Sequence, residues 1–87
     1  MELKDTVNLM LSDDWRDRLK AEWLQVKIRH ERLIGFIEAA DQGKTNYRSE
    51  EGRAVLKSQR DMMANYMTVL EWRMKDAGIE FEPYTAE

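Results

Sequence analysis

Residues 12–41 read SDDWRDRLKAEWLQVKIRHERLIGFIEAAD and contain no proline. Positions suited to a buried helix face recur in this segment in alternating steps of four and three residues, as in a heptad repeat. Those positions are Leu19, Trp23, Val26, His30, Leu33, Ile37 and Ala40. Ser12 is a suitable N-cap, and Gly43 can adopt the left-handed conformation that ends a helix. The pattern predicts a long helix over residues 12–41.

A second helical pattern covers residues 49–77. Ser49 is a suitable N-cap, and Glu50 and Glu51 follow it in the turn where the helix dipole favours acidic side chains. The repeat then places a second set of residues on one face. That set is Leu56, Gln59, Met63, Tyr66, Leu70, Arg73 and Ala77. With a short leading helix over residues 1–11, the sequence predicts an all-α fold built on a long antiparallel helical hairpin.

The composition limits what this chain can do. It has 87 residues, no cysteine and one histidine, His30, so we expect a single domain over residues 1–87, with no disulfide and no metal site. The four glycines stand apart and form no phosphate-binding loop. We therefore expect no enzyme activity and no cofactor. The N-terminus has no basic segment followed by an apolar one, and no run is long enough for a transmembrane helix, so we expect a cytoplasmic protein.

Charge is distributed unevenly along the chain. Residues 15–33 hold six basic against three acidic residues, and residues 44–60 hold five against two. The net charge is −3, which is unfavourable for general binding of DNA or RNA. Local basic surface on an acidic protein suits a small anionic ligand better. Residues 78–87 form an acidic tail in which apolar and acidic residues alternate, and we expect it to be extended and available to a partner.

The second helix has more apolar residues than one hairpin can cover. Outside its predicted buried face lie Val55, Met62, Met67, Val69, Trp72 and Met74. A helix that is apolar on several sides needs several partners, so we expect a homo-oligomer in which hairpins pack against hairpins. The alternative is a monomeric three-helix bundle in which the leading helix covers the second face.

Polar residues at apolar positions of the repeat are candidates for a ligand site. His30, Gln59 and Arg73 either pair across helices and fix their register or line a polar pocket at a subunit boundary. Trp15 precedes Arg16 and Arg18, a combination suited to base stacking and phosphate binding. The alternative is that Trp15 packs at the start of the helix as part of a hydrophobic staple. Asn65 flanks the predicted interface. The candidate ligand-binding residues are Trp15, Arg16, Lys27, His30, Arg32, Asn65 and Arg73.

The residues at these positions resemble a known family. The segment from Asp14 to Trp23, the pairs Arg32–Leu33 and Phe36–Ile37, and the later order of Gln59, Met63, Tyr66, Leu70 and Arg73 are similar to a helical-hairpin family of small phage proteins. This family includes the anti-CBASS cyclic-oligonucleotide sponge and the related anti-Thoeris sponge. The resemblance covers roughly residues 12–78.

The resemblance implies a compact homohexamer that holds cyclic dinucleotides between subunits and cyclic trinucleotides in a second class of pocket, without catalysis. It implies that Trp15 takes the place of a pocket aromatic that is commonly tyrosine, that Lys27 or Arg32 is the pocket base, and that Arg73 is the late arginine. His30 departs from the family's pattern, which often has an aromatic residue there.

The expected function is therefore a viral immune-evasion protein of a bacteriophage. It would sequester messengers such as 3′,3′-cyclic GMP-AMP and cyclic tri-AMP in the cytoplasm of the infected bacterial host, and so block CBASS effector activation. A helical adaptor that docks on a host or phage protein through its apolar stripe and acidic tail is the alternative. A small transcription regulator is the third possibility.

Overall fold

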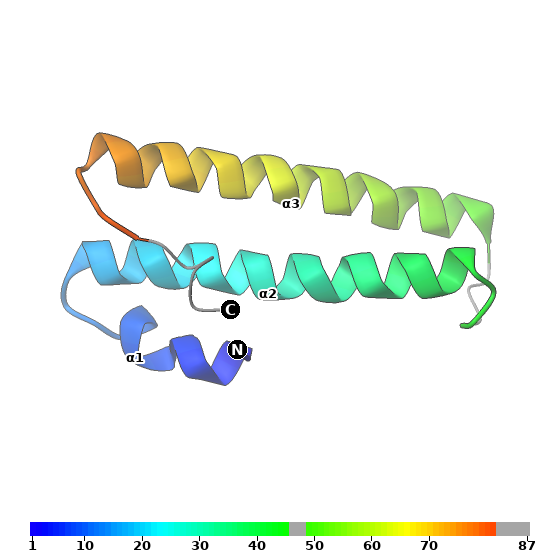
Figure 1. Ribbon diagram of the computed structural model, residues 1–87, viewed down its shortest axis with the longest axis horizontal. Helices are drawn as coiled ribbons and strands as arrows, with labels where there is room; N and C mark the ends of the chain where they lie inside the picture. Colours follow the sequence, from blue (N-terminus) through cyan, green and yellow to red (C-terminus); the bar gives the residue numbers. More distant parts are fainter. Residues whose placement is uncertain (46–48, 82–87) are drawn as a thin grey trace.

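A computed structural model describes residues 1–45 and 49–81 as an all-helical structure with no β-strand among these residues. A 3₁₀ helix, η1 (Leu3–Thr6), leads directly into α1 (Val7–Met10), and the long helices α2 (Trp15–Asp41) and α3 (Glu50–Asp76) follow. Helices α2 and α3 lie side by side and antiparallel, and η1 and α1 lie along α2 on the side away from α3 (Figure 1). The sequence-based expectation of a leading helix and a long hairpin agrees with this architecture.

The helix ends follow local side-chain chemistry. Ser49 caps α3 as predicted, because its hydroxyl accepts a hydrogen bond from the Gly52 amide at 3.0 Å. The predicted cap of α2 is wrong. Asp14, not Ser12, caps this helix by accepting a hydrogen bond from the Arg16 amide at 2.9 Å, while the Ser12 hydroxyl donates to Asp17 at 2.8 Å.

Gly78 directs the chain after α3. Its φ of 70° is left-handed, and the Ile79 amide donates to the Met74 carbonyl at 2.9 Å across the turn, which is the pattern of a Schellman motif. The turn brings Ile79 and Phe81 back against the hydrophobic core. This part of the predicted tail is therefore packed on its own hairpin, and residues 82–87 lie outside the described residues.

The core lies between α2 and α3. Leu19, Trp23 and Val26 of α2 pack with Leu70 and Met74 of α3, and Trp23 and Leu70 are fully buried. Two cross-helix ion pairs fix the other end of the hairpin. Asp41 lies 3.2 Å from the Lys57 ammonium and 3.8 Å from the Arg53 guanidinium.

The buried face of α3 differs from the predicted one. Met74 is buried, whereas Gln59, Tyr66 and Arg73, which the repeat assigned to the buried face, are exposed. The prediction was correct for Leu70, which is buried, and wrong for every second member of the set. At Tyr66 and Arg73 the residue one position later, Met67 and Met74, packs against α2 instead. Ala77, the last member of the predicted set, is the exposed C-cap.

The leading segment covers α2 rather than α3. Thr6 is fully buried. Its hydroxyl donates to the Leu3 carbonyl at 2.7 Å and accepts a hydrogen bond from the Gln25 amide at 3.0 Å. Among the described elements, η1 and α1 make no contact with α3. The three-helix alternative, in which the leading helix covers the second face of α3, is therefore wrong.

We expect the two overlapping heptad sets of α3 to differ in their effect on stability. Met74→Ala should lower the free energy of unfolding by about 2–5 kcal/mol because it opens a cavity in the core. Arg73→Ala should change it by less than about 0.5 kcal/mol because Arg73 is exposed. Urea denaturation followed by circular dichroism measures both, and the reverse order of effects would contradict the observed register.

The buried Thr6 hydroxyl should contribute to the docking of the leading segment. Thr6→Val keeps the shape but removes the hydroxyl that pairs with Gln25, so we expect a loss of about 1–3 kcal/mol in urea denaturation. Thr68→Val is the matched control, because the Thr68 hydroxyl also donates to a backbone carbonyl, that of Ala64 at 3.2 Å, but is exposed. Equal effects of the two substitutions would contradict this role for Thr6.

Candidate functional site

One flank of the hairpin brings together arginine and aromatic side chains from both long helices. Arg73 of α3 lies 3.9 Å from Glu22 of α2, and this ion pair marks where the two helices meet. Residues seven apart share a helix face, so Trp15, Arg29 and Phe36 lie on the face of α2 that carries Glu22, and Tyr66 lies on the face of α3 that carries Arg73. We call these six residues the open flank.

The open flank is accessible and cationic. Trp15, Phe36 and Tyr66 are 50%, 40% and 42% exposed, and Arg73 and Glu22 keep 55% and 40% of their side-chain surface exposed. An exposed ion pair is weak, so the Arg73 guanidinium can exchange Glu22 for a stronger anion. Arginine binds phosphate oxygens in a bidentate manner, and aromatic rings stack on bases.

The opposite flank is closed by the segment after α3, and we call it the strapped flank. The Phe81 ring packs edge-on against Trp23, with ring centroids 5.9 Å apart. The Lys20 ammonium lies 5.8 Å from the Phe81 ring centroid, and the Lys27 ammonium lies 5.8 Å from that of Trp23. A cavity of about 230 Å³ remains here. Its lining residues are Trp23, Glu71, Met74, Lys75, Ile79 and Phe81.

Lys27 packs into this strapped flank. Only 14% of its side-chain surface is exposed, and its ammonium also lies 3.6 Å from the Glu31 carboxylate. A ligand on the open flank would therefore not meet Lys27 of the same chain.

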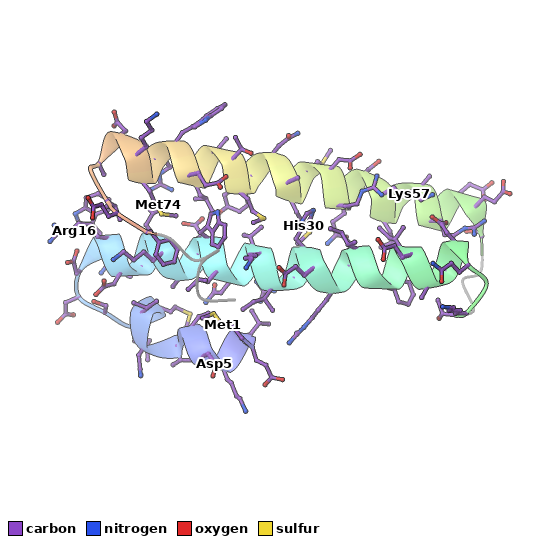
Figure 2. The ribbon with its side chains drawn as sticks, in the orientation of Figure 1. Met1, Asp5, Arg16, His30, Lys57 and Met74 are labelled. Atoms are coloured by element: carbon purple, nitrogen blue, oxygen red, sulfur yellow. The ribbon has the colours of Figure 1, made fainter. Side chains whose placement is uncertain are left out.

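Arg16 is held at the start of α2. Its guanidinium donates to both carboxylate oxygens of Asp14, at 3.1 and 3.0 Å. These hydrogen bonds hold the pKa of Asp14 below its ordinary value and raise the pKa of Arg16 above its own. Figure 2 shows Arg16 at the end of the hairpin where α3 finishes. Asp14 thus occupies two of the five N–H donors of Arg16, and an anion that bound this same edge would have to displace the carboxylate.

The other candidates lie on separate surfaces. His30 is half-buried and lies between α2 and α3 (Figure 2). Arg32 follows Gln25 by seven residues and is exposed, so it lies on the side of α2 that carries the leading segment. Asn65 is exposed on α3. Of the seven predicted site residues, the hairpin brings Trp15 and Arg73 onto one flank and disperses the rest.

The sequence analysis missed Arg29 and Tyr66 as site candidates. The signal was present in the spacing, because Arg29 follows Glu22 by seven residues and Tyr66 precedes Arg73 by seven. Tyr66 also lines a shallow groove of about 550 Å³ along α3. The other lining residues are Val55, Ser58, Gln59, Met62 and Met63. The open flank is thus continuous with an apolar groove.

Fold and surface together define a small all-helical hairpin protein with cationic and aromatic side chains along an accessible flank. The model of the Sequestin family matches residues 13–76, and the chain belongs to this family. Membership identifies a sequestering protein, and implies binding of a small ligand rather than catalysis. No curated protein and no solved structure matches the chain.

Across residues 1–45 and 49–81, no three acidic or histidine side chains gather as they would around a metal ion. Within the same ranges, no helix has an apolar stretch that could span a bilayer.

The Asp14–Arg16 pair should make stability depend on pH in acid. Because folding lowers the pKa of Asp14, its ionised form stabilises the fold above the unfolded-state pKa, and this contribution disappears as the pH falls through the folded-state pKa. Asp14→Asn retains an N-cap but not the charge, so between about pH 5 and pH 2 this variant should lose less stability than the native chain. Urea denaturation across this range measures the difference, with Asp13→Asn as the control. An unchanged pH profile for Asp14→Asn would contradict the pairing.

Proposed function

We propose that this protein sequesters cyclic di- and trinucleotide immune messengers without cleaving them. In this proposal it is a phage counter-defence protein, acts in the cytoplasm of the infected bacterial host and prevents CBASS effector activation. Membership of the Sequestin family carries the proposal, because the family implies that a small ligand is bound and withheld. The cyclic nucleotide is inferred from the resemblance to cyclic-oligonucleotide sponges and from the chemistry of the open flank.

The open flank has the groups that a cyclic nucleotide requires. Arg29 and Arg73 can neutralise phosphates, while Trp15 and Tyr66 can stack on bases. Arg29 lies seven residues from Glu22, the partner of Arg73, which places it about 10 Å further along α2. A small ring with two or three phosphates needs a few arginines at this spacing rather than a basic protein.

A single hairpin offers this ligand an exposed surface rather than a pocket. Tight small-molecule sites enclose most of the ligand surface, and the open flank leaves its aromatic rings about half exposed. The proposal therefore includes a homo-oligomer, a hexamer by the resemblance, in which a neighbouring copy closes the site. Arg16, Lys27, His30, Arg32 and Asn65 stay candidates only as groups that a neighbouring copy contributes or that a second class of pocket uses.

A helical adaptor is the second candidate function, and one observation favours it. Val55, Met62 and Trp72 of α3 are 67%, 71% and 65% exposed, so another protein could dock there. The tail contributes less to this alternative than the sequence suggested, because Ile79 and Phe81 pack against the chain's own core.

The proposed function predicts direct binding of 3′,3′-cyclic GMP-AMP or cyclic tri-AMP in calorimetry, with the nucleotide recovered unmodified by chromatography. Arg73→Ala should weaken at least one of these ligands tenfold or more, about 1.4 kcal/mol, with helicity retained. Arg53→Ala is the matched control, because Arg53 also extends from α3 to a carboxylate of α2, that of Asp41 at 3.8 Å, but at the opposite end of the hairpin from Arg73.

Two results would contradict this prediction. No heat with either nucleotide at protein concentrations up to about 100 μM, where a micromolar Kd would be evident, would remove the proposed ligand class. Equal losses for Arg53→Ala and Arg73→Ala would show that the open flank is not the site.

A further inference from the structure

The outer face of α3 carries an exposed apolar stripe with a two-fold symmetric order. Val55, Met62 and Val69 are seven residues apart and therefore lie on one line along the helix. They are 67%, 71% and 44% exposed. Met62 lies at the midpoint, so a two-fold rotation through Met62 exchanges the positions of Val55 and Val69.

We propose that α3 pairs antiparallel with α3 of a second copy about Met62, and that this contact brings the open flanks of the two copies together. The pairing concerns the protein surface and holds whether or not a cyclic nucleotide binds. Its consequence for the ligand rests on the proposed function.

The pairing is complementary along its length. At the centre, Met62 contacts Met62 of the second copy, and Val55 contacts Val69 of the second copy on either side. On one edge, Gln59 faces Tyr66 of the second copy, so two polar groups meet. An isologous interface requires this kind of self-complementarity.

The groove supports the second copy as the occupant. It runs along α3 from Val55, past the midpoint at Met62, to Tyr66 and has a volume of about 550 Å³. In the antiparallel arrangement, the apolar side chain that enters it is Val69 of the second copy. The groove of the second copy receives Val69 of the first, so both apolar surfaces are covered at once.

Charge at the helix ends favours the antiparallel direction. The first turn of α3 carries Glu50 and Glu51, and the last turn carries Arg73 and Lys75. Antiparallel pairing sets each acidic turn against a basic turn of the other copy, whereas parallel pairing would set acid against acid.

The same symmetry places the two open flanks on one side of the contact. Gln59, Tyr66 and Arg73 share the edge of α3 that borders α2, as the Arg73–Glu22 ion pair shows. A two-fold axis perpendicular to α3 keeps this edge on the same side in both copies. The two α2 helices therefore lie on that side too, and the cleft between them is lined by Arg29 and Tyr66 of both copies.

Cysteine cross-linking without any nucleotide tests the pairing, because the chain has no cysteine of its own. Met62→Cys should form a disulfide-linked dimer. Val55→Cys and Val69→Cys should each stay unlinked alone, because self-pairing would span about 21 Å, and should cross-link when mixed. Leu11→Cys, which is as exposed as Met62 at 71%, is the control that should not react.

Light scattering on cysteine-free variants gives a second readout. Met62→Glu sets two carboxylates against each other at the centre and should weaken self-association at least tenfold with helicity retained, whereas Leu11→Glu should not. Three results would overturn the pairing. The first is a native chain that is monomeric at about 100 μM, where a micromolar contact would be populated. The second is a Val55→Cys variant that cross-links to itself as readily as to Val69→Cys. The third is unchanged self-association in Met62→Glu.

The two proposals can fail separately. Cross-linked dimers that bind no cyclic nucleotide would remove the proposed ligand and leave the pairing. Ligand binding by Met62→Glu with unchanged affinity and as a monomer would remove the shared cleft and leave the sequestering function.

Discussion

Two apolar stripes run along α3, one residue out of phase, and α2 can cover only one of them. Successive residues on a helix are about 100° apart, so the stripe with Leu70 and Met74 and the stripe with Met62 and Val69 face different directions. Trp23 and its neighbours on α2 bury the first stripe. The second stays exposed in one copy, and exposed apolar surface of this extent is typical of an interaction site.

The termini of the hairpin determine which of its flanks is available. Gly78 turns the chain after α3, and Phe81 then packs on Trp23 beside Lys20 and Lys27. These two lysines consequently serve the structure of the chain itself. On the other flank, Arg73 pairs with Glu22, whose side chain is 40% exposed, so the guanidinium of Arg73 is accessible to a ligand. A net negative protein can thus present a local cationic surface.

Much of the fold was predictable from the sequence because the periodicity of apolar residues and the capping residues both indicate helices. The α2 repeat, the Ser49 cap and the glycine turns are local features. The register of α3 was not predictable in the same way, since Tyr66 and Met67, or Arg73 and Met74, fit overlapping repeats equally well. Only the packing of Met74 against α2 decides between them.

The candidate site was less predictable than the fold for a related reason. Trp15 and Arg73 lie on the same flank because the hairpin aligns the start of α2 with the end of α3, which chain spacing alone does not show. Lys27 and Arg32 are five residues apart on α2. Lys27 lies on the strapped flank and Arg32 on the side that carries the leading segment, and these surfaces are defined by the packing of Phe81 and Thr6. Tyr66 was overlooked because the repeat placed it on the buried face of α3, and Arg29 was overlooked because it is not a member of the α2 repeat.

Native mass spectrometry of the protein mixed with 3′,3′-cyclic GMP-AMP tests most directly whether copies of this chain join to hold a small ligand. The expected spectrum shows an assembly with an even number of chains that carries the nucleotide at its unaltered mass. A single chain without bound nucleotide, or a nucleotide heavier by one water molecule, would contradict sequestration between paired hairpins.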